Sequence, residues 1–141
     1  LYFEKSNSNR SEIFKYVDSH DDQDRHFLGI YTKKGHVIGT HSLRIDRQAS
    51  RFTIGVMIGD KNFWGQGVTL ETRATLLDYG FQEQGCVKAE GGCSARNYSA
   101  IFNYMKQGWT QEGIRRAHIT KDENRIDFVL FGLLRERWFD K

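Results

Sequence analysis

The loop at residues 59–67 separates two different hydrophobic periods, and this change constrains the fold more than any other feature of the sequence. Before the loop, residues 24–32, 36–46 and 51–59 are runs rich in Ile, Val, Phe and Thr, joined by the short turns KKG and RQAS. Such runs predict the strands of an antiparallel meander. After the loop, apolar residues recur at the spacing of one helix face, at Leu70, Ala74, Leu77 and Phe81.

The rest of the chain alternates between helix and strand patterns. The predicted elements, in order, are a helix at 10–19, the three strands above, a helix at 67–84, a strand at 86–94, a helix at 98–106, and a hairpin of strands at 109–120 and 125–134 around the turn KDEN. Asn97 is placed to cap the start of the 98–106 helix. Gly85 is placed to end the 67–84 helix, and Gly108 to end the 98–106 helix. A strand that passes through a helix into another strand usually lies parallel to it. We therefore predict an α+β or mixed α/β fold with a mixed sheet.

Length and composition limit the classes of protein. The 141 residues fit one domain with a single core, which we expect to span 1–141. Lys and Arg, 21 in all, are interspersed with 18 Asp and Glu, so we predict no nucleic-acid partner. No apolar stretch is long enough to span a membrane, and no signal peptide is visible. Because the chain opens on Leu1 rather than methionine, we expect its natural start to be missing.

The cysteines and histidines do not predict a metal site. Cys86 and Cys93 are the only two cysteines, and on one strand-like segment they would point to opposite faces, too far apart to bridge. Their spacing is not that of metal ligands, and the five histidines are scattered. Free thiols suit a reducing compartment, so we expect a cytoplasmic protein.

Gly65 and Gly67, in the stretch KNFWGQGVTLE, lie where the last strand of the meander gives way to the helix. A strand, a glycine-rich loop and a helix can form an anion site, because backbone N–H groups converge there at the positive end of the helix dipole. The same glycines also suit an ordinary tight turn. The loop is not a nucleotide P-loop, because no Gly-Lys-Ser or Gly-Lys-Thr follows, and it lacks the third glycine of the Rossmann fingerprint.

Two segments together resemble the GNAT superfamily of N-acetyltransferases. FWGQGVTLET is similar to the loop YWGKGYGTEA of a bacterial branch that includes ribosomal-protein, polyamine and amino-sugar acetyltransferases. That branch also carries the downstream pattern AGCYAxN…SI…YEKxGF..EG. The matching residues downstream are Gly92, Cys93, Ala95, Asn97, Ile101, Tyr104, Lys106, Gly108, Glu112 and Gly113. The resemblance covers roughly residues 26–134, and motifs in the same order are more specific than any one of them.

The resemblance implies a splayed sheet that holds acetyl-CoA as cosubstrate, without a metal. It also implies that the first strand and helix of the family are missing ahead of Leu1. The pyrophosphate would lie on the backbone amides of Trp64, Gly65, Gln66, Gly67 and Val68 and on Thr69. The pantetheine arm would run between Met57 and Ile58 on one strand and Gly92 and Cys93 on another, fixed by Asn97. Tyr104 would donate a proton to the leaving thiolate, and a backbone N–H near Met57 or Ile58 would face the oxyanion.

The general base is the point where the sequence departs from the family. The strand FTIGVMIG carries no carboxylate, so His41, Glu90 and Asp60 stay open as candidates, together with a water chain that delivers a deprotonated amine. Asn62 replaces the Gln or Arg usual before the loop, and Ala100 replaces the usual Ser. Tyr104 could instead be a packing residue, Asn97 a plain cap, and His41 an ordinary strand residue.

These observations predict an acetyl-CoA-dependent N-acetyltransferase in which a primary amine attacks the thioester directly in a ternary complex. The acceptor expected from the AGC variant of the motif is a small amine or an amino sugar. Two alternatives remain: a non-catalytic CoA-binding or interaction module of the same fold, and a protein N-terminal acetyltransferase. A homodimer through the final hairpin or an exposed edge is compatible with the sequence, and nothing in the sequence requires one.

Overall fold

The computed structural model describes residue 15 and residues 18–21 and 23–140. The elements are β1 (Arg25–Tyr31), β2 (Val37–Asp46), β3 (Arg51–Ile58), η2 (Lys61–Phe63), α2 (Val68–Asp78), η3 (Tyr79–Glu83), β4 (Lys88–Ser94), α3 (Tyr98–Lys106), β5 (Thr110–Lys121), β6 (Asn124–Leu134) and α4 (Arg135–Phe139). The predicted helix at 10–19 lies mostly outside the described residues. All six predicted strands are present, with ends that differ from the predicted ones by at most two residues.

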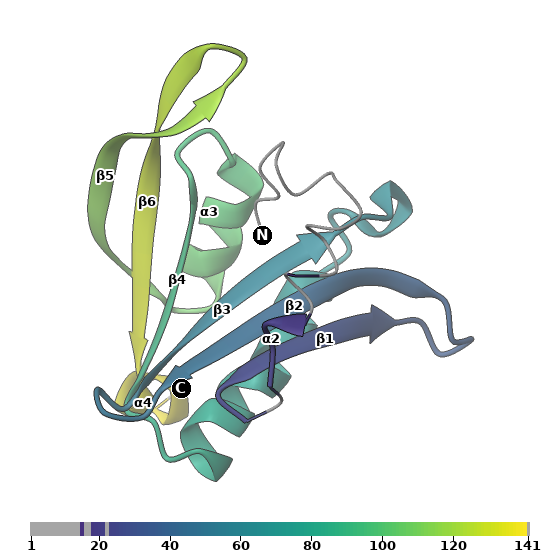
Figure 1. Cartoon of the computed structure of the whole chain (residues 1–141), viewed down its shortest axis with the longest axis vertical. Helices are drawn as coiled ribbons and strands as arrows, with labels where there is room; N and C mark the ends of the chain where they lie inside the picture. The colour runs from purple at the N-terminus through teal and green to yellow at the C-terminus, as the bar shows by residue number, and fades with distance from the viewer. Residues whose placement is uncertain (1–14, 16–17, 22, 141) are drawn as a thin grey trace.

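The six strands form one mixed sheet in the order β1-β2-β3-β4-β6-β5 (Figure 1). The β1–β2–β3 meander, the β4–β6 pair and the β5–β6 hairpin are antiparallel, whereas β3 and β4 are parallel. The connection from β3 to β4 passes through α2, as expected for a parallel pair. The predicted mixed α/β fold is therefore confirmed.

The pairing of β3 with β4 ends early, and this opening is what positions the candidate site. The two strands pair only at Arg51↔Lys88, Phe52↔Ala89 and Thr53↔Glu90. Beyond Thr53 they diverge (Figure 1), while β4 stays paired with β6 along its whole length. The splayed sheet that the family resemblance implied is thus present.

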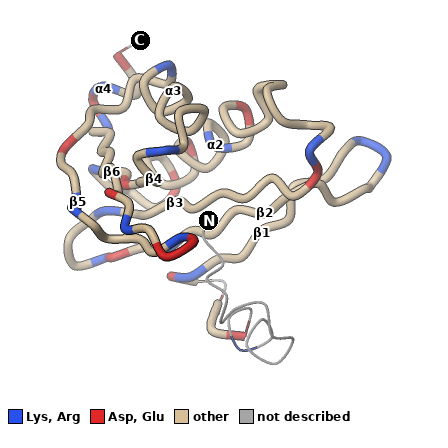
Figure 2. The backbone as a smooth tube through the Cα atoms, turned by 90° about the horizontal axis from the view of Figure 1, so that it is seen from above, with Lys and Arg blue, Asp and Glu red and all other residues tan. Residues whose placement is uncertain are grey.

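The core lies between the sheet and its helices. Seen from above, α2, α3 and α4 lie on the same side of strands β1–β4, and basic and acidic residues are interspersed along the chain (Figure 2). Phe52 and Ile54 of β3, Leu77 of α2 and Phe131 of β6 are among the buried residues of this core. Cys86 and Cys93 are free thiols, as predicted, and both are buried.

Three local features differ from the sequence predictions. The helix that begins at Val68 ends in the π-helical turn η3, where Gly80 lies against Phe52: a Cβ on this glycine would be 2.3 Å from Phe52 Cζ. The β5–β6 turn is tighter than the predicted KDEN loop, because Asp122 and Glu123 both adopt positive φ. The short helix α4 was not predicted. Its Trp138 is buried and donates a hydrogen bond from Nε1 to Asp78 Oδ1 at 2.8 Å.

Candidate active site

The loop between β3 and α2 has the backbone geometry of an anion-binding site. Gly65 and Gly67 both have φ of +75°, and no atom lies within 4 Å of the Cβ position of either. Positive φ favours glycine at both positions, and the open space leaves the backbone accessible. Gly67 also begins α2 without a side-chain cap, so the N–H groups of the first turn are free of a capping side chain. This arrangement suits a diphosphate.

Hydrogen bonds from side chains hold the loop in place. Asp60 begins the turn of η2 and accepts a hydrogen bond from the Asn62 backbone N–H at 3.0 Å. Trp64 Nε1 donates to the Ile58 carbonyl at 2.8 Å, which ties the loop back to the end of β3. Gln66 Nε2 donates to the Asn62 carbonyl at 2.7 Å. The amides of the loop are therefore arranged by its own side chains before any ligand binds.

Tyr104 lies directly beneath the backbone of β4. Its side chain is 3% exposed, and its hydroxyl donates to the Gly92 carbonyl at 3.4 Å. The ring stacks on Phe131, with centroids 4.4 Å apart at 12°, and meets the edge of Trp109 at 5.0 Å. Burial raises the pKa of Tyr104, so the hydroxyl keeps its proton at neutral pH.

Gly91 makes this close approach possible. A Cβ at Gly91 would lie 2.4 Å from the Tyr104 hydroxyl oxygen, and one at Gly92 would lie 2.3 Å from Phe128 Cε1. Because successive strand residues point to opposite faces, the two glycines leave β4 without a side chain on either face where β3 has moved away. Gly92 was predicted as a cofactor contact from the sequence and Gly91 was not, although the two glycines are adjacent in the stretch EGGC.

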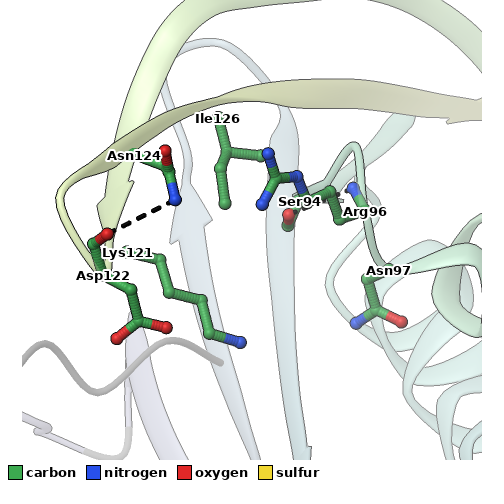
Figure 3. A pocket seen from close by; sticks show the side chains of 7 residues that line it. All are labelled: Ser94, Arg96, Asn97, Lys121, Asp122, Asn124 and Ile126. Carbon is green, nitrogen blue, oxygen red and sulfur yellow. Dashed lines mark hydrogen bonds between the residues drawn. The ribbon is translucent and has the colours of Figure 1, made fainter.

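Asn97 caps α3, as predicted, and also lines a cavity. Its Oδ1 accepts a hydrogen bond from the Ala100 N–H at 3.1 Å. The cavity, about 460 Å³, lies between the β4–α3 connection and the β5–β6 turn (Figure 3). It is lined by Ser94, Arg96, Asn97, Lys121, Asp122, Asn124 and Ile126. Charged groups of both signs therefore border the exposed face of the Asn97 side chain.

The candidates for the general base lie in different environments. His41 is 2% exposed, with Nε2 2.6 Å from Thr72 Oγ1 and Nδ1 3.2 Å from the Gly55 carbonyl oxygen. Burial lowers the pKa of His41 to about 4, so its ring is neutral at neutral pH. The Glu90 side chain is half-buried, and its Oε1 lies 3.6 Å from Arg51 Nη1. Since Gly91 faces Tyr104, alternation puts Glu90 on the other face of β4.

The remaining predicted contacts follow the two diverging strands. Met57 and Ile58 pair with Thr40 and Gly39 of β2, and neither has a register partner on β4. Cys93 is buried, and burial raises the pKa of its thiol to about 11, so it is not a thiolate at neutral pH. Among the residues that the structure describes, no cluster of three or more His, Cys, Asp or Glu is placed to hold a metal ion. Within that same part of the chain, no helix is long and apolar enough to cross a bilayer.

Arg73 is the functional candidate that the sequence analysis missed. It is 2% exposed and packs over Tyr104, with Cζ 4.3 Å from the ring centroid. Its spacing from Leu70 and Leu77 was a usable signal, because residues three and four apart share one helix face. An arginine on an apolar face predicts a buried charge or a close polar contact.

Comparison with known proteins identifies the family. The family described as Acetyltransferase (GNAT) domain matches residues 2–123, so the chain belongs to the GNAT acetyltransferases. The probable N-acetyltransferase YjcK of Bacillus subtilis is 30% identical over 112 residues, which cover 78% of this chain and 62% of YjcK. The chain thus spans less than two thirds of the length of that relative.

Solved structures share the fold at lower sequence identity. A chimera of spermidine N-acetyltransferase SpeG from Vibrio cholerae and hSSAT superposes with a TM-score of 0.89 at 17% identity, covering 100% of this chain and 86% of the chimera. Spermidine N-acetyltransferase from Vibrio cholerae in complex with CoA and spermine gives 0.86 at 17% identity, covering 96% and 81% of the two chains. These likenesses establish the fold, and the predicted membership of the GNAT superfamily is confirmed.

Proposed function

We propose that this chain binds acetyl-CoA and transfers its acetyl group to a primary amine of a small molecule, which attacks the thioester directly. One observation carries the proposal: the divergence of β3 and β4 has an amide-rich loop at Gly65–Gly67 beside it and the protonated Tyr104 hydroxyl beneath Gly91 and Gly92. Thioester transfer requires these two groups at the opening of the sheet: an anion site that holds the cofactor and an acid that protonates the leaving thiolate.

The residues present fit the cofactor. The amides of Gly65, Gln66, Gly67 and Val68, with the Thr69 hydroxyl, would hold the pyrophosphate at the N-terminus of α2. The Trp64 N–H, which the sequence also suggested, already donates to the Lys61 carbonyl at 3.2 Å. Met57 and Ile58 on one side and Gly92 and Cys93 on the other would offer backbone groups to an extended pantetheine arm, which adds to a sheet edge as a peptide strand does. Asn97 would contact the arm from the start of α3. When bound, acetyl-CoA supplies the activated acetyl group.

Residues of this chain would supply the acid, the oxyanion contact and the base for acetyl transfer. Tyr104 is held by its ring contacts with its hydroxyl near the β4 backbone, where it can give its proton to the departing sulfur. A backbone N–H near Met57 or Ile58 would stabilise the oxyanion. For proton removal from the amine we favour Glu90 over His41. Glu90 is partly exposed at the last β3–β4 pair, whereas His41 is buried, already hydrogen-bonded and weakly basic. Asp60 and a water chain remain the other routes.

We also propose the chemical class of the acceptor. The similar Vibrio cholerae structure contains spermine, and a small amine or an amino sugar fits the motif variant of this chain. The cavity beside Asn97 carries Arg96, Lys121 and Asp122, so it suits a polar acceptor with groups of both charges. We further propose a cytoplasmic location, supported by the two unbridged cysteines.

An amine panel scored by CoA release tests the function. We expect turnover with at least one polyamine, amino sugar or simple primary amine, and a large loss of kcat with little change in acetyl-CoA affinity in Tyr104→Phe. Tyr98→Phe is the matched control, because Tyr98 lies on the same helix and is 76% exposed. Equal kcat in the two variants would remove Tyr104 from the mechanism.

A second function is favoured by one specific observation: strand β3 carries no carboxylate. A non-catalytic module that binds CoA would explain it. Binding of acetyl-CoA without turnover on the amine panel, extended to peptides with free N-termini, supports that module. Turnover on the peptides alone would instead indicate a protein N-terminal acetyltransferase.

Light scattering of the same sample distinguishes a monomer from the homodimer that the sequence allows.

A further inference from the structure

Arg73 occupies an unusual place for an arginine. It lies near the middle of α2 and is among the largest fully buried side chains of the chain. Arginine is rarely buried unless a carboxylate pairs with it, because burying an unpaired charge is costly. Within the described residues, no Asp or Glu forms an ion pair with Arg73. The fold therefore carries a buried positive charge that nothing yet described requires.

The hydrogen bonds of Arg73 fix its position without neutralising it. Its Nε donates to Gln107 Oε1 at 2.6 Å. Gln107 is itself held, because its Nε2 donates to the Leu70 carbonyl at 3.0 Å and its Oε1 also accepts from Trp109 Nε1 at 3.1 Å. A neutral amide is thus the acceptor for Nε. The Nη2 atom is buried and has no hydrogen-bond partner, so the guanidinium retains its full charge and an unused donor.

The guanidinium faces the proposed acid. Its Cζ is 4.3 Å from the Tyr104 ring centroid and 5.4 Å from that of Trp109. The other titratable groups close to this pair are neutral at pH 7: Cys93 of β4, whose pKa is raised by burial, and His41 of β2, whose pKa is lowered. Arg73 is therefore the charge that acts on Tyr104. Burial raises the pKa of Tyr104, and the positive charge of Arg73 lowers it.

We propose that Arg73 is a positioning residue for the acid, stabilising the negative charge left on the Tyr104 oxygen when its proton passes to the leaving thiolate. This inference rests on the proposed function. In the step, the amine nitrogen forms a bond to the acetyl carbon, and the thioester C–S bond breaks with its electron pair on sulfur. The O–H bond of Tyr104 breaks, and an S–H bond forms. The attacking nitrogen loses its extra proton to the base or to water. Tyr104 regains a proton from solvent, so the chain ends as it began.

The arrangement explains how a buried tyrosine can act as an acid. Without a nearby cation, a phenolate in this apolar site would be too unstable to form during turnover, because desolvation disfavours the charged form. A cation within a few ångströms offsets that cost by an amount equivalent to about one to three pKa units. Gln107 holds the cation above the ring, where it can act on the phenolate throughout the reaction.

A double-mutant cycle in turnover tests the proposal. Arg73→Met removes the charge and keeps the length, and we expect kcat to fall about tenfold or more. The KM for acetyl-CoA should change by less than about twofold, since Arg73 is not among the residues proposed to hold the pyrophosphate. Arg73→Lys keeps the charge and should retain most of the activity. In the Tyr104→Phe background, Arg73→Met should leave kcat unchanged. An equal loss in both backgrounds would mean a purely structural role and would overturn the proposal.

A second measurement does not depend on turnover. With ¹³Cζ-labelled tyrosine, the Tyr104 signal, assigned by its absence in Tyr104→Phe, should begin to titrate about one pH unit or more higher in Arg73→Met than in the native chain. An identical titration overturns the inference whether or not the amine panel succeeds, whereas failure of the panel alone counts against the proposed function. If Arg73→Met does not fold, Gln107→Met releases the guanidinium and should shift the same signal upward, and no shift in that variant also overturns it.

Discussion

Gly91→Ala should displace the Tyr104 hydroxyl by a distance that the structure fixes. The new Cβ would lie 2.4 Å from the hydroxyl oxygen and 3.0 Å from Cε1 and Cζ, whereas ordinary contact begins at 3.4 Å. The hydroxyl must therefore move by about 1 Å, or the β4 backbone must yield. The ring cannot move freely, because Phe131, Trp109 and the Arg73 guanidinium surround it.

The displacement should lower both the free energy of unfolding and the rate of acetyl transfer. Overpacking of this kind typically lowers the free energy of unfolding by about 1–3 kcal/mol, which for a chain of this size is a melting temperature roughly 3–12 °C lower. A displacement of about 1 Å at a catalytic group can also reduce turnover by about a hundredfold. We therefore expect Gly91→Ala to fold, to melt at a lower temperature and to lose nearly all acetyl transfer.

Thermal unfolding by circular dichroism, with CoA release as the activity assay, measures both. Gly59→Ala is the control, because Gly59 has no atom within 4 Å of its Cβ position and no positive φ. Adding Tyr104→Phe to Gly91→Ala removes the shortest contact, so the two substitutions together should destabilise less than the sum of their separate effects. Additive losses, or a melting temperature of Gly91→Ala equal to that of Gly59→Ala, would refute the reasoning.

Two further predictions concern pH and capping. His41 has a pKa of about 4 in the native chain, against 6.5 in the unfolded chain. Between these values the unfolded chain binds a proton that the native chain does not. The free energy of unfolding should therefore fall by about 3 kcal/mol as the pH drops from 7 to 4. Urea unfolding of the native chain and of His41→Gln between pH 7 and pH 4 measures this fall. If the free energy of unfolding depends on pH as steeply in His41→Gln as in the native chain, His41 is not the group responsible. Asn97→Ala should cost about 1 kcal/mol of stability in urea unfolding, and Asn97→Asp much less, because only Asp keeps the cap on the Ala100 N–H; equal losses would show that the cap contributes nothing.

The strands and the larger helices were predictable because their signals are local. Runs rich in Ile, Val, Phe and Thr, bounded by short turns, predicted β1–β3 within one residue of their observed ends. The apolar residues from Leu70 to Phe81 lie on the buried side of α2 and η3. Asn97 was recognised as a cap from its type and its place before a helical pattern. The divergence of β3 and β4 was predicted from the family resemblance alone. The residues of the two strands carry no local signal for the point where their pairing ends.

Features that depend on contacts between distant residues could not be predicted in the same way. The apolar run of β6 is followed at once by the charged stretch 135–137, so no local apolar pattern predicts the short α4. The partner of its Trp138 indole, Asp78, lies sixty residues earlier in the chain. Gly91 matters only because Tyr104, thirteen residues later, lies beneath it. The burial of Arg73 depends on the ring of Tyr104 in α3 and on Gln107, the residue that caps the end of α3.

Isothermal titration of acetyl-CoA into the native chain, Gly67→Val and Gly35→Val tests the central claim most directly. Gly35 is the matched control, because it also has a positive φ, +88° against +75°, and open space at its Cβ, but it lies in the β1–β2 turn. Both variants therefore carry similar backbone strain, and only Gly67→Val fills the proposed cradle. We predict binding to the native chain and to Gly35→Val, and none to Gly67→Val. Absence of binding to the native chain, or equal affinity in all three, would contradict the account.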